Sequence, residues 1–141
     1  MWSLPLTGRC QCGAAAYEVS ADPVAVYVCR CRECQRQSAS AFGISVSVPI
    51  SAFQLTRGEV RPWSRRTDRG RTLDCRCCPA CGSRLWHEGA GRDGLSGQGG
   101  SLDRPLDPAG AVHIWTSRGL PGVVVPEGAR QVPASLTSCP A

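Results

Sequence analysis

The sequence contains no lysine and no asparagine, and all 16 of its basic residues are arginine. Its longest apolar run, residues 24–28, is far shorter than the roughly 20 residues that a membrane-spanning helix needs. Residues 1–6 provide neither a basic segment nor an apolar one, so no signal peptide is predicted. We therefore expect a protein of the cytoplasm that neither spans a membrane nor is secreted.

Glycine and proline are frequent instead. The 141 residues include 16 glycines and 11 prolines, against average frequencies of about 7% and 5%, which disfavours long helices. With 42% apolar residues the chain supports one modest core. We expect a mainly β fold in a single domain over residues 1–141, with a core at about residues 6–116 and an extended C-terminal tail at residues 117–141.

Residue patterns predict short elements throughout. Alternating and β-branched residues favour strands in six places: residues 14–19, 24–29, 42–48, 72–77, 83–87 and 111–116. One short helix is expected at residues 32–38, where no residue is β-branched. Residues 53–56 and 60–63 flank Arg57-Gly58-Glu59 and suggest a hairpin, whereas the glycine-rich stretch 90–100 is expected to be a loop.

The net charge of +5 is spread along the chain with one exception. Five arginines alternate with proline, aspartate and glycine, which indicates a solvated loop: Arg61, Arg65, Arg66, Arg69 and Arg71. Trp63 is the one aromatic residue there, which is little for a base-stacking platform. Nucleic acid is therefore not the expected partner, and a non-catalytic zinc-binding module that contacts nucleic acid or protein is the alternative function.

Cysteine is the most informative residue type. The ten cysteines fall mostly in close groups, one to three positions apart: Cys10 and Cys12; Cys29, Cys31 and Cys34; Cys75, Cys77, Cys78 and Cys81; with Cys139 alone. Disulfides across such short loops are strained, and dense cysteine without secretion indicates metal or redox chemistry. We predict metal sites, with thiol redox chemistry at residues 29–34 as a lesser alternative.

Two of the pairs together match a structural metal site. Residues i and i+2 of a strand share a face, so Cys10 and Cys12 can present both sulfurs together. The segment Cys78-Pro-Ala-Cys81-Gly82 is typical of a zinc knuckle, whose turn uses the positive φ that glycine permits. Four thiolates make the closed tetrahedral site that structural zinc occupies.

The remaining group offers three thiolates within six residues. Cys29, Cys31 and Cys34 leave a fourth position open, which is the pattern of a catalytic zinc. Such a centre can hold a substrate thiol as the thiolate and polarise an aldehyde oxygen. A fourth cysteine could close the site instead, the candidates being Cys75, Cys77 and Cys139, and an iron–sulfur cluster remains an alternative to zinc.

These residues resemble a known family. The segments Cys10-Gln-Cys-Gly13, Cys29-Arg-Cys-Arg-Glu-Cys34, Cys78-Pro-Ala-Cys-Gly-Ser-Arg-Leu-Trp86, Ser101-Leu-Asp-Arg-Pro105 and His113-Ile-Trp115 are similar to those of the glutathione-dependent formaldehyde-activating (GFA) family, or CENP-V/GFA domain. The resemblance implies small coiled β-sheets stapled by zinc, a fold called β-tent or Mss-like. It implies two zinc ions per chain, a structural one on Cys10, Cys12, Cys78 and Cys81 and a catalytic one on Cys29, Cys31 and Cys34.

The resemblance also implies an activity. The chain is expected to be a carbon–sulfur lyase, similar to S-(hydroxymethyl)glutathione synthase, that forms or cleaves an S-hydroxyalkyl adduct of a glutathione-like thiol and an aldehyde. It departs from the family pattern at Arg30, where histidine is usual, at Ala39, where glycine is usual, and at Cys77, where an aromatic residue is usual. We expect Cys77 to be buried in the core. The stretch 91–100 lacks the apolar strand that often precedes the Ser-Leu-Asp element.

Further residues are candidates for binding the substrate. Arg32 and Arg36 lie close in sequence to the three cysteines and could bind carboxylates. Ser38 and Ser40 follow on the turn that should approach the site, and both can donate hydrogen bonds. The chain has two histidines, His87 and His113, and we expect His87 to be structural.

Overall fold

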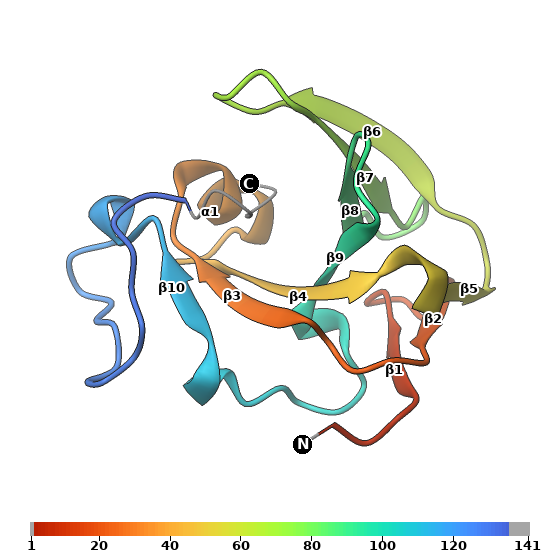
Figure 1. Cartoon of the computed structure of the whole chain (residues 1–141). Coiled ribbons are helices and arrows are strands. Elements are labelled where there is room, and N and C mark those ends of the chain that lie inside the picture. Colours follow the sequence, from red (N-terminus) through yellow and green to blue (C-terminus); the bar gives the residue numbers. More distant parts are fainter. Residues whose placement is uncertain (1, 136–141) are drawn as a thin grey trace.

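The computed structural model describes residues 2–135, in which ten strands form two sheets (Figure 1). The smaller sheet is antiparallel, in the order β1 (Leu6–Arg9), β2 (Ala16–Val19) and β5 (Phe53–Arg57). The larger sheet has the order β10 (Val112–Ile114), β3 (Ala25–Cys29), β4 (Gly43–Pro49), β9 (Gly94–Gln98), β8 (Arg84–Gly89), β7 (Thr72–Cys77) and β6 (Arg61–Arg66). Its strands are antiparallel except for β10, which runs parallel to β3.

The larger sheet curls without closing. Its β6–β7 hairpin arches toward α1 (Arg32–Ser38), which follows β3 near the other end of the sheet (Figure 1). Asp68, in the turn of that hairpin, reaches Arg118 near β10, with 3.9 Å between the charged atoms. The curl therefore brings side chains of β6–β8 over the segment that contains Cys29, Cys31 and Cys34.

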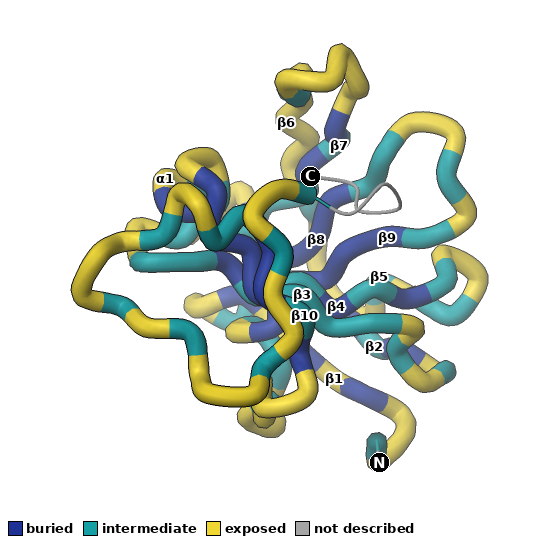
Figure 2. The backbone as a smooth tube through the Cα atoms, turned by 60° about the vertical axis from the view of Figure 1, so that its left-hand side comes forward, coloured by how far each residue is buried: buried dark blue, intermediate teal, exposed yellow. Residues whose placement is uncertain are grey.

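Buried residues gather in two clusters, and each contains cysteines. Figure 2 shows buried segments along β8 and β9 and again around β3 and β10. The larger cluster lies between the two sheets, where Phe53 packs against Tyr17 and Trp86 at ring distances of 5.0 and 4.5 Å. The smaller cluster joins Cys29 and Cys31 to Ile114 of β10. The fold thus forms a separate apolar support beneath each group of cysteines.

The predicted helix is confirmed at residues 32–38. Cys31 caps its N-terminus, since the Cys31 sulfur accepts a hydrogen bond from the Cys34 N–H at 3.3 Å. At the other end Ala39 has a φ of 50°, a left-handed conformation that glycine adopts more easily. Three short 3₁₀ turns connect strands, namely η1 (Ile50–Ala52), η2 (Gly99–Ser101) and η3 (Pro108–Gly110), and η4 (Thr116–Arg118) follows β10. The described residues include no helix with the length and apolarity to cross a membrane.

Two predictions about the strands were wrong. The stretch 90–100 is not a loop throughout, because its residues 94–98 form β9 between β4 and β8, with Leu95 buried. Strand β9 therefore supplies the strand before the Ser-Leu-Asp element that the sequence was expected to lack. Residues 53–63 form no hairpin, because β5 pairs with β2 in the smaller sheet and β6 pairs with β7 in the larger one.

The reason lies at the connection between β5 and β6. Gly58 has a φ of 75°, and a Cβ on it would lie 2.0 Å from the Ala14 carbonyl oxygen, so this turn packs tightly against the start of β2. The chain then leaves the smaller sheet. Arg61, Arg65 and Arg66 consequently lie on strand β6, at the edge of the larger sheet. The prediction that these three arginines lie in a loop was therefore wrong.

Arg30, which stands where the family usually has histidine, is almost fully buried. Its guanidinium donates to the carbonyl oxygens of Val123 and Val124 at 2.8 and 3.2 Å and lies 3.2 Å from the His113 Nδ1. It also lies 5.3 Å from the Phe42 ring centroid. Arg30 therefore connects β3, β10 and the segment after η4, and it points away from neighbouring Cys29 and Cys31.

We predict that Arg30→Met destabilises the protein by about 2 kcal/mol, because the buried His113 nitrogen loses its donor. Arg36→Met is the matched control, since the Arg36 side chain is 65% exposed. Urea unfolding measures both variants, and limited proteolysis reports whether residues 119–132 detach in Arg30→Met. Equal stability of the two variants would contradict this role of Arg30.

Candidate metal centres

Two turns of similar construction bring the first four cysteines together. In each, a cysteine N–H and carbonyl close a tight loop: Cys10 bonds to Ala15 and Gly13, and Cys78 bonds to Ser83 and Gly82. Gly13 and Gly82 have φ values of 80° and 79°, as the knuckle prediction for the second turn requires. The first turn joins β1 to β2 and the second joins β7 to β8, so the cluster links the two sheets.

The spacing of these sulfurs fits a tetrahedral metal. All four Sγ atoms lie within 4.8 Å of one another, and Cys12 Sγ lies 3.6 Å from Cys10 and 3.7 Å from Cys78. A zinc ion with four Zn–S bonds of about 2.3 Å separates its sulfurs by about 3.8 Å. These four residues are free thiols, and their donor set fits zinc.

Ser83 holds the two turns in register. Its hydroxyl accepts a hydrogen bond from the Gln11 N–H at 3.1 Å and lies 3.2 Å from Cys81 Sγ. This hydroxyl lowers the pKa of Cys81 to about 5, which favours the thiolate that binds metal. Ala15 and Cys81 donate backbone N–H bonds to Cys10 and Cys78 at 3.3 and 3.5 Å.

The second cluster is the predicted set of three. Cys29 ends β3, Cys31 caps α1 and Cys34 lies in the first helical turn, and their sulfurs lie within 4.8 Å of one another. Hydrogen bonds from the Cys29 and Cys34 thiols lower the pKa of Cys31 to about 2, and the same bond to Cys31 raises the pKa of Cys29. The pKa of Cys34 is likewise raised, to about 12, so these bonds favour one thiolate, at Cys31, and a metal would have to displace the protons of the other two thiols.

Neither Cys75 nor Cys77 belongs to either cluster among the residues described. Cys75 is fully buried on β7, whereas Cys77 is only half-buried. The expectation that Cys77 is a core residue was therefore wrong, because the register shift between Arg76 and Cys77 interrupts the strand alternation. Cys139, the third candidate for a fourth ligand, lies outside residues 2–135.

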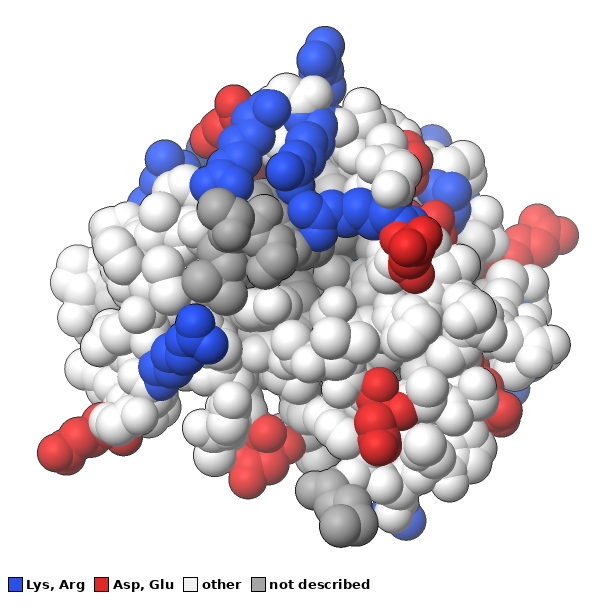
Figure 3. Space-filling model, viewed as in Figure 1, with Lys and Arg blue, Asp and Glu red and all other residues white. Residues whose placement is uncertain are grey.

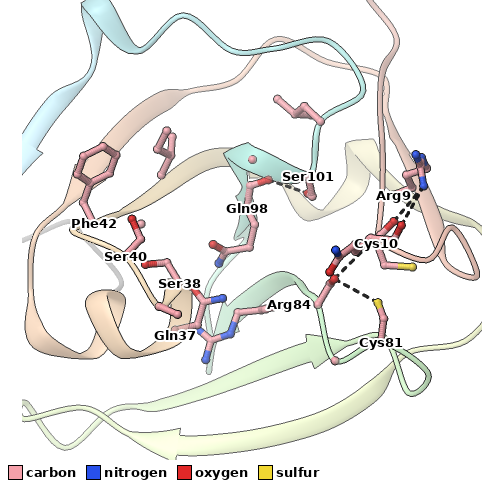
Figure 4. A pocket seen from close by; sticks show the side chains of 18 of the residues that line it. Arg9, Cys10, Gln37, Ser38, Ser40, Phe42, Cys81, Arg84, Gln98 and Ser101 are labelled. Atoms are coloured by element: carbon pink, nitrogen blue, oxygen red, sulfur yellow. Dashed lines mark hydrogen bonds between the residues drawn. The ribbon is translucent and has the colours of Figure 1, made fainter.

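A pocket of ≈ 1050 Å³ lies between the two clusters. Its wall includes Cys10 and Cys81 on one side and the turn from α1 to β4 on the other, as Figure 4 shows. Arg84 extends from β8 across this space toward Gln37 and Ser38 (Figure 4). About half of the lining is polar, and its charged residues are Arg9, Arg84 and Asp103, which suits a ligand with several charged or amide groups.

The lining of the pocket adjoins the three-cysteine cluster at Gly43. This buried glycine lines the pocket, and a Cβ on it would lie 3.7 Å from Cys34 Sγ. Arg84 also lines a second, much smaller cavity beside Cys29 and Cys34. Gly43 therefore separates the large pocket from Cys34 by a residue without a side chain.

Of the four candidate substrate residues, two line the large pocket and two lie outside it. Ser38 and Ser40 both line the large pocket, although the Ser38 hydroxyl donates to the Cys34 carbonyl at 2.8 Å. Arg32 and Arg36 are exposed on α1 outside its lining, where Arg32 bonds to Gln35 and Arg36 forms an ion pair with Glu33 at 2.6 Å. A substrate role for all four residues stays a prediction.

Arginines of the β6–β8 region were missed as candidates for the site. Arg84 lies 5.9 Å from the Trp63 ring centroid, and Arg65 lines the small cavity beside Cys34. Arginine side chains gather over the top of the molecule in the view of Figure 3, where the β6–β7 hairpin and α1 lie, while acidic side chains are scattered. Arg65 and Arg84 lie near the three-cysteine cluster only because the sheet curls, so no local sequence signal predicts that they belong to the site.

Comparison with known proteins identifies the family of this chain. A family model described as glutathione-dependent formaldehyde-activating enzyme matches residues 5–118. The chain belongs to the GFA family. A crystal structure of a Rhodobacter sphaeroides protein resembles this GFA chain with a TM-score of 0.56 and 20% sequence identity, covering 72% of this chain and 91% of that one, and shows a shared fold. No curated protein matched the chain.

We predict that Ser83→Ala lowers the metal affinity of the four-cysteine cluster about tenfold, as loss of a group that orients metal ligands does. Competition with a chromophoric chelator measures the affinity. Ser64→Ala serves as the control, since the Ser64 hydroxyl bonds to Asp74 on the exposed side of the β6–β7 hairpin. Equal affinity of wild type and Ser83→Ala would show that the Ser83 hydroxyl does not support this cluster.

Proposed function

We propose that this GFA-family chain is a zinc-dependent carbon–sulfur lyase that joins a glutathione-like thiol to an aldehyde, or cleaves the resulting S-hydroxyalkyl adduct. The observation that supports it best is the contrast between the two clusters: four convergent thiols in one, and three thiols in the other, of which Cys29 and Cys34 line a small cavity. A closed set suits a structural ion, and an incomplete set suits an ion that exchanges its fourth ligand. The nine cysteines described are free thiols, which fits the proposal that the protein works in the cytoplasm.

The large pocket would hold the thiol substrate. Its volume of ≈ 1050 Å³ accommodates a tripeptide. Arg84 and Arg9 line it and would pair with the two carboxylates, and Ser38 and Ser40 would donate hydrogen bonds to peptide groups. Gly43, where a Cβ would lie 3.7 Å from Cys34 Sγ, is the point of the lining next to this cluster, and the substrate sulfur would approach the metal there.

The chemistry is the addition of a thiol to a carbonyl group. Zinc held by Cys29, Cys31 and Cys34 would lower the pKa of a substrate thiol and act as a Lewis acid. The thiol loses its proton, its sulfur bonds to the carbonyl carbon, and the carbonyl π electrons move to the oxygen, which takes up a proton. The reverse sequence cleaves the adduct, so the same residues serve both directions.

The first test is the metal content. We predict two zinc ions per chain by native mass spectrometry, and a chelator should remove the ion of the three-cysteine cluster first because it has fewer thiolates. Cys78→Ser should unfold the chain, since structural zinc contributes on the order of 10 kcal/mol in zinc-finger peptides. Cys31→Ser should keep the fold and lose one ion.

Cys77→Ser is the matched control and should retain both ions, since Cys77 belongs to neither cluster. Circular dichroism and thermal melts compare the variants. Equal destabilisation by Cys78→Ser and Cys31→Ser would make both sites structural and would favour a zinc-binding module that contacts nucleic acid or protein. A metal-free chain with disulfides would overturn the proposal altogether.

The second test is thiol binding. Glutathione added to the cobalt-substituted protein should change the thiolate-to-cobalt charge-transfer bands as a further sulfur enters. Arg84→Gln should weaken this binding about tenfold by removing a charged hydrogen bond, without loss of metal. Arg32→Gln and Arg36→Gln test the two helix arginines in the same assay.

The pattern of these variants decides where the tripeptide lies. Weaker binding in the Arg32 or Arg36 variants, with Arg84→Gln unchanged, would place it along α1 instead of in the pocket. If no thiol at millimolar concentration changes the cobalt spectrum, the enzymatic function is rejected. Adduct formation itself is followed by NMR of the hydroxymethyl group, as acceleration above the uncatalysed reaction.

A further inference from the structure

A small cavity lies directly beside the three-cysteine cluster. Its volume of ≈ 20 Å³ has room for about one water-sized group. Cys29 and Cys34 line it from one side, and Arg65, Arg84 and His87 line it from the other, where the sheet curls over. A further pocket of ≈ 290 Å³ adjoins this cavity, because Tyr27 and His87 line both. His87 therefore stands between the three-cysteine cluster and that pocket.

The His87 side chain has an unusual environment. It is 6% exposed, and neither of its ring nitrogens has a hydrogen-bond partner among residues 2–135. Buried polar groups are normally paired, because an unpaired one costs free energy. The other histidine, His113, is equally buried but lies within hydrogen-bond distance of Arg30. His87 is thus the histidine left with unused polar atoms, and it faces the cavity that touches the cysteines.

The ring is neutral at physiological pH. Burial, together with the positive charges of Arg84 and Arg65, lowers the pKa of His87 to about 4. Glu33 is the acidic residue that lines the same cavity, and its carboxylate is paired with Arg36. A neutral imidazole has one N–H donor and one acceptor nitrogen. His87 can therefore donate to a small oxygen-containing group in the cavity.

We propose that His87 is the residue that binds the aldehyde, donating its N–H to the carbonyl oxygen of a one-carbon aldehyde, formaldehyde, in the cavity beside Cys29 and Cys34. This inference rests on the proposed function and assigns the second substrate a place. Negative charge grows on that oxygen as the sulfur–carbon bond forms, and the His87 N–H together with the positive charge of Arg65 stabilises it. The proton that the thiol lost ends on the oxygen by way of water, which balances the addition.

The cavity also sets the size of the aldehyde. Room for one water-sized group admits a CH₂=O unit, whereas each additional carbon would have to displace the Tyr27, Leu73 or Ile114 side chains that also line it. Leu73 and Ile114 are 1% and 0% exposed, so they have little freedom to move. Selection for formaldehyde over longer aldehydes is therefore expected from this wall.

The first experiment observes His87 directly. Zinc-loaded protein with ¹⁵N-labelled histidine rings gives two sets of ring signals, and His87→Phe identifies those of His87. Formaldehyde should shift the His87 signals saturably and leave those of His113 in place, and propionaldehyde should shift neither. The absence of lysine removes the side-chain amines with which formaldehyde would otherwise react.

This readout does not depend on turnover. Unmoved His87 signals, or equal shifts at both histidines, would overturn the proposal whether or not adduct formation is accelerated. His87→Phe should be at least as stable as wild type, because it fills the same space without an unpaired polar atom. Marked destabilisation by this variant would assign His87 a structural role and would also overturn the proposal.

The second experiment separates the proposal from the function on which it rests. His87→Phe should lower kcat/KM for formaldehyde about 100-fold, as loss of one donor to a developing oxyanion does, while glutathione still changes the cobalt spectrum as in wild type. His87→Gln, which keeps a donor, should recover at least tenfold of that loss. Acceleration by wild type that His87→Phe retains would reject the role of His87 and leave the function standing. No acceleration by wild type would reject the function, and the ring signals would still decide whether His87 binds the aldehyde.

Discussion

The four sulfurs of Cys10, Cys12, Cys78 and Cys81 meet where the two sheets meet, and the arrangement of the molecule depends on that convergence. The smaller sheet has three short strands and shares no strand pairing with the larger one. It is joined to the larger sheet by the packing of Phe53 against Trp86 and by the two cysteine turns. A metal at this point would be a cross-link between residues about 66 positions apart, and its free energy of binding would be free energy of folding.

The three-cysteine cluster depends on a different set of supports. Cys29 lies between β4 and β10 in the sheet, while Cys31 and Cys34 are fixed by the N-terminal turn of α1. Gln35 strengthens this arrangement, since its side-chain amide donates to the carbonyls of Arg30 and Arg118 at 2.8 and 2.9 Å. The cluster is therefore held by neighbours that leave one side of it facing the small cavity, which suits a site that must exchange a ligand.

The sequence predicted the cysteine clusters and α1 well, because these depend on local spacing. The turn at Cys78–Gly82 contains its own closing hydrogen bond and its own glycine, and residues 32–38 are capped by Cys31 within one turn. Strand β9 could not be predicted, because Gly94 and Gly97 are unfavourable in isolated strands. They are accepted here because β9 pairs with β4 on one side and with β8 on the other.

Long-range arrangements escaped prediction for a related reason. Nothing between residues 53 and 66 shows that β5 and β6 enter different sheets, since that choice depends on β2 and β7. His87 is adjacent to Trp86 in a buried strand and looks like an ordinary core residue until the curl of the sheet brings it to the cavity beside Cys29 and Cys34. The chemistry of single residues was visible in the sequence, whereas their meeting at one place required the fold.

The hydrogen bonds of buried Arg30 to Val123 and Val124 have a consequence for the order of events during synthesis. Arg30 and its acceptor at Val123 are 93 residues apart, so at 5–20 residues per second the ribosome delivers the second roughly 5 to 20 s after the first. In the later part of this interval the nascent thiols of residues 29–34 are outside the exit tunnel, before β10 and the segment that covers Arg30 have been synthesised. Residues 29–34 are then most accessible to metal donors and to oxidants. This accessibility ends when residues 112–132 have been synthesised and pack against them.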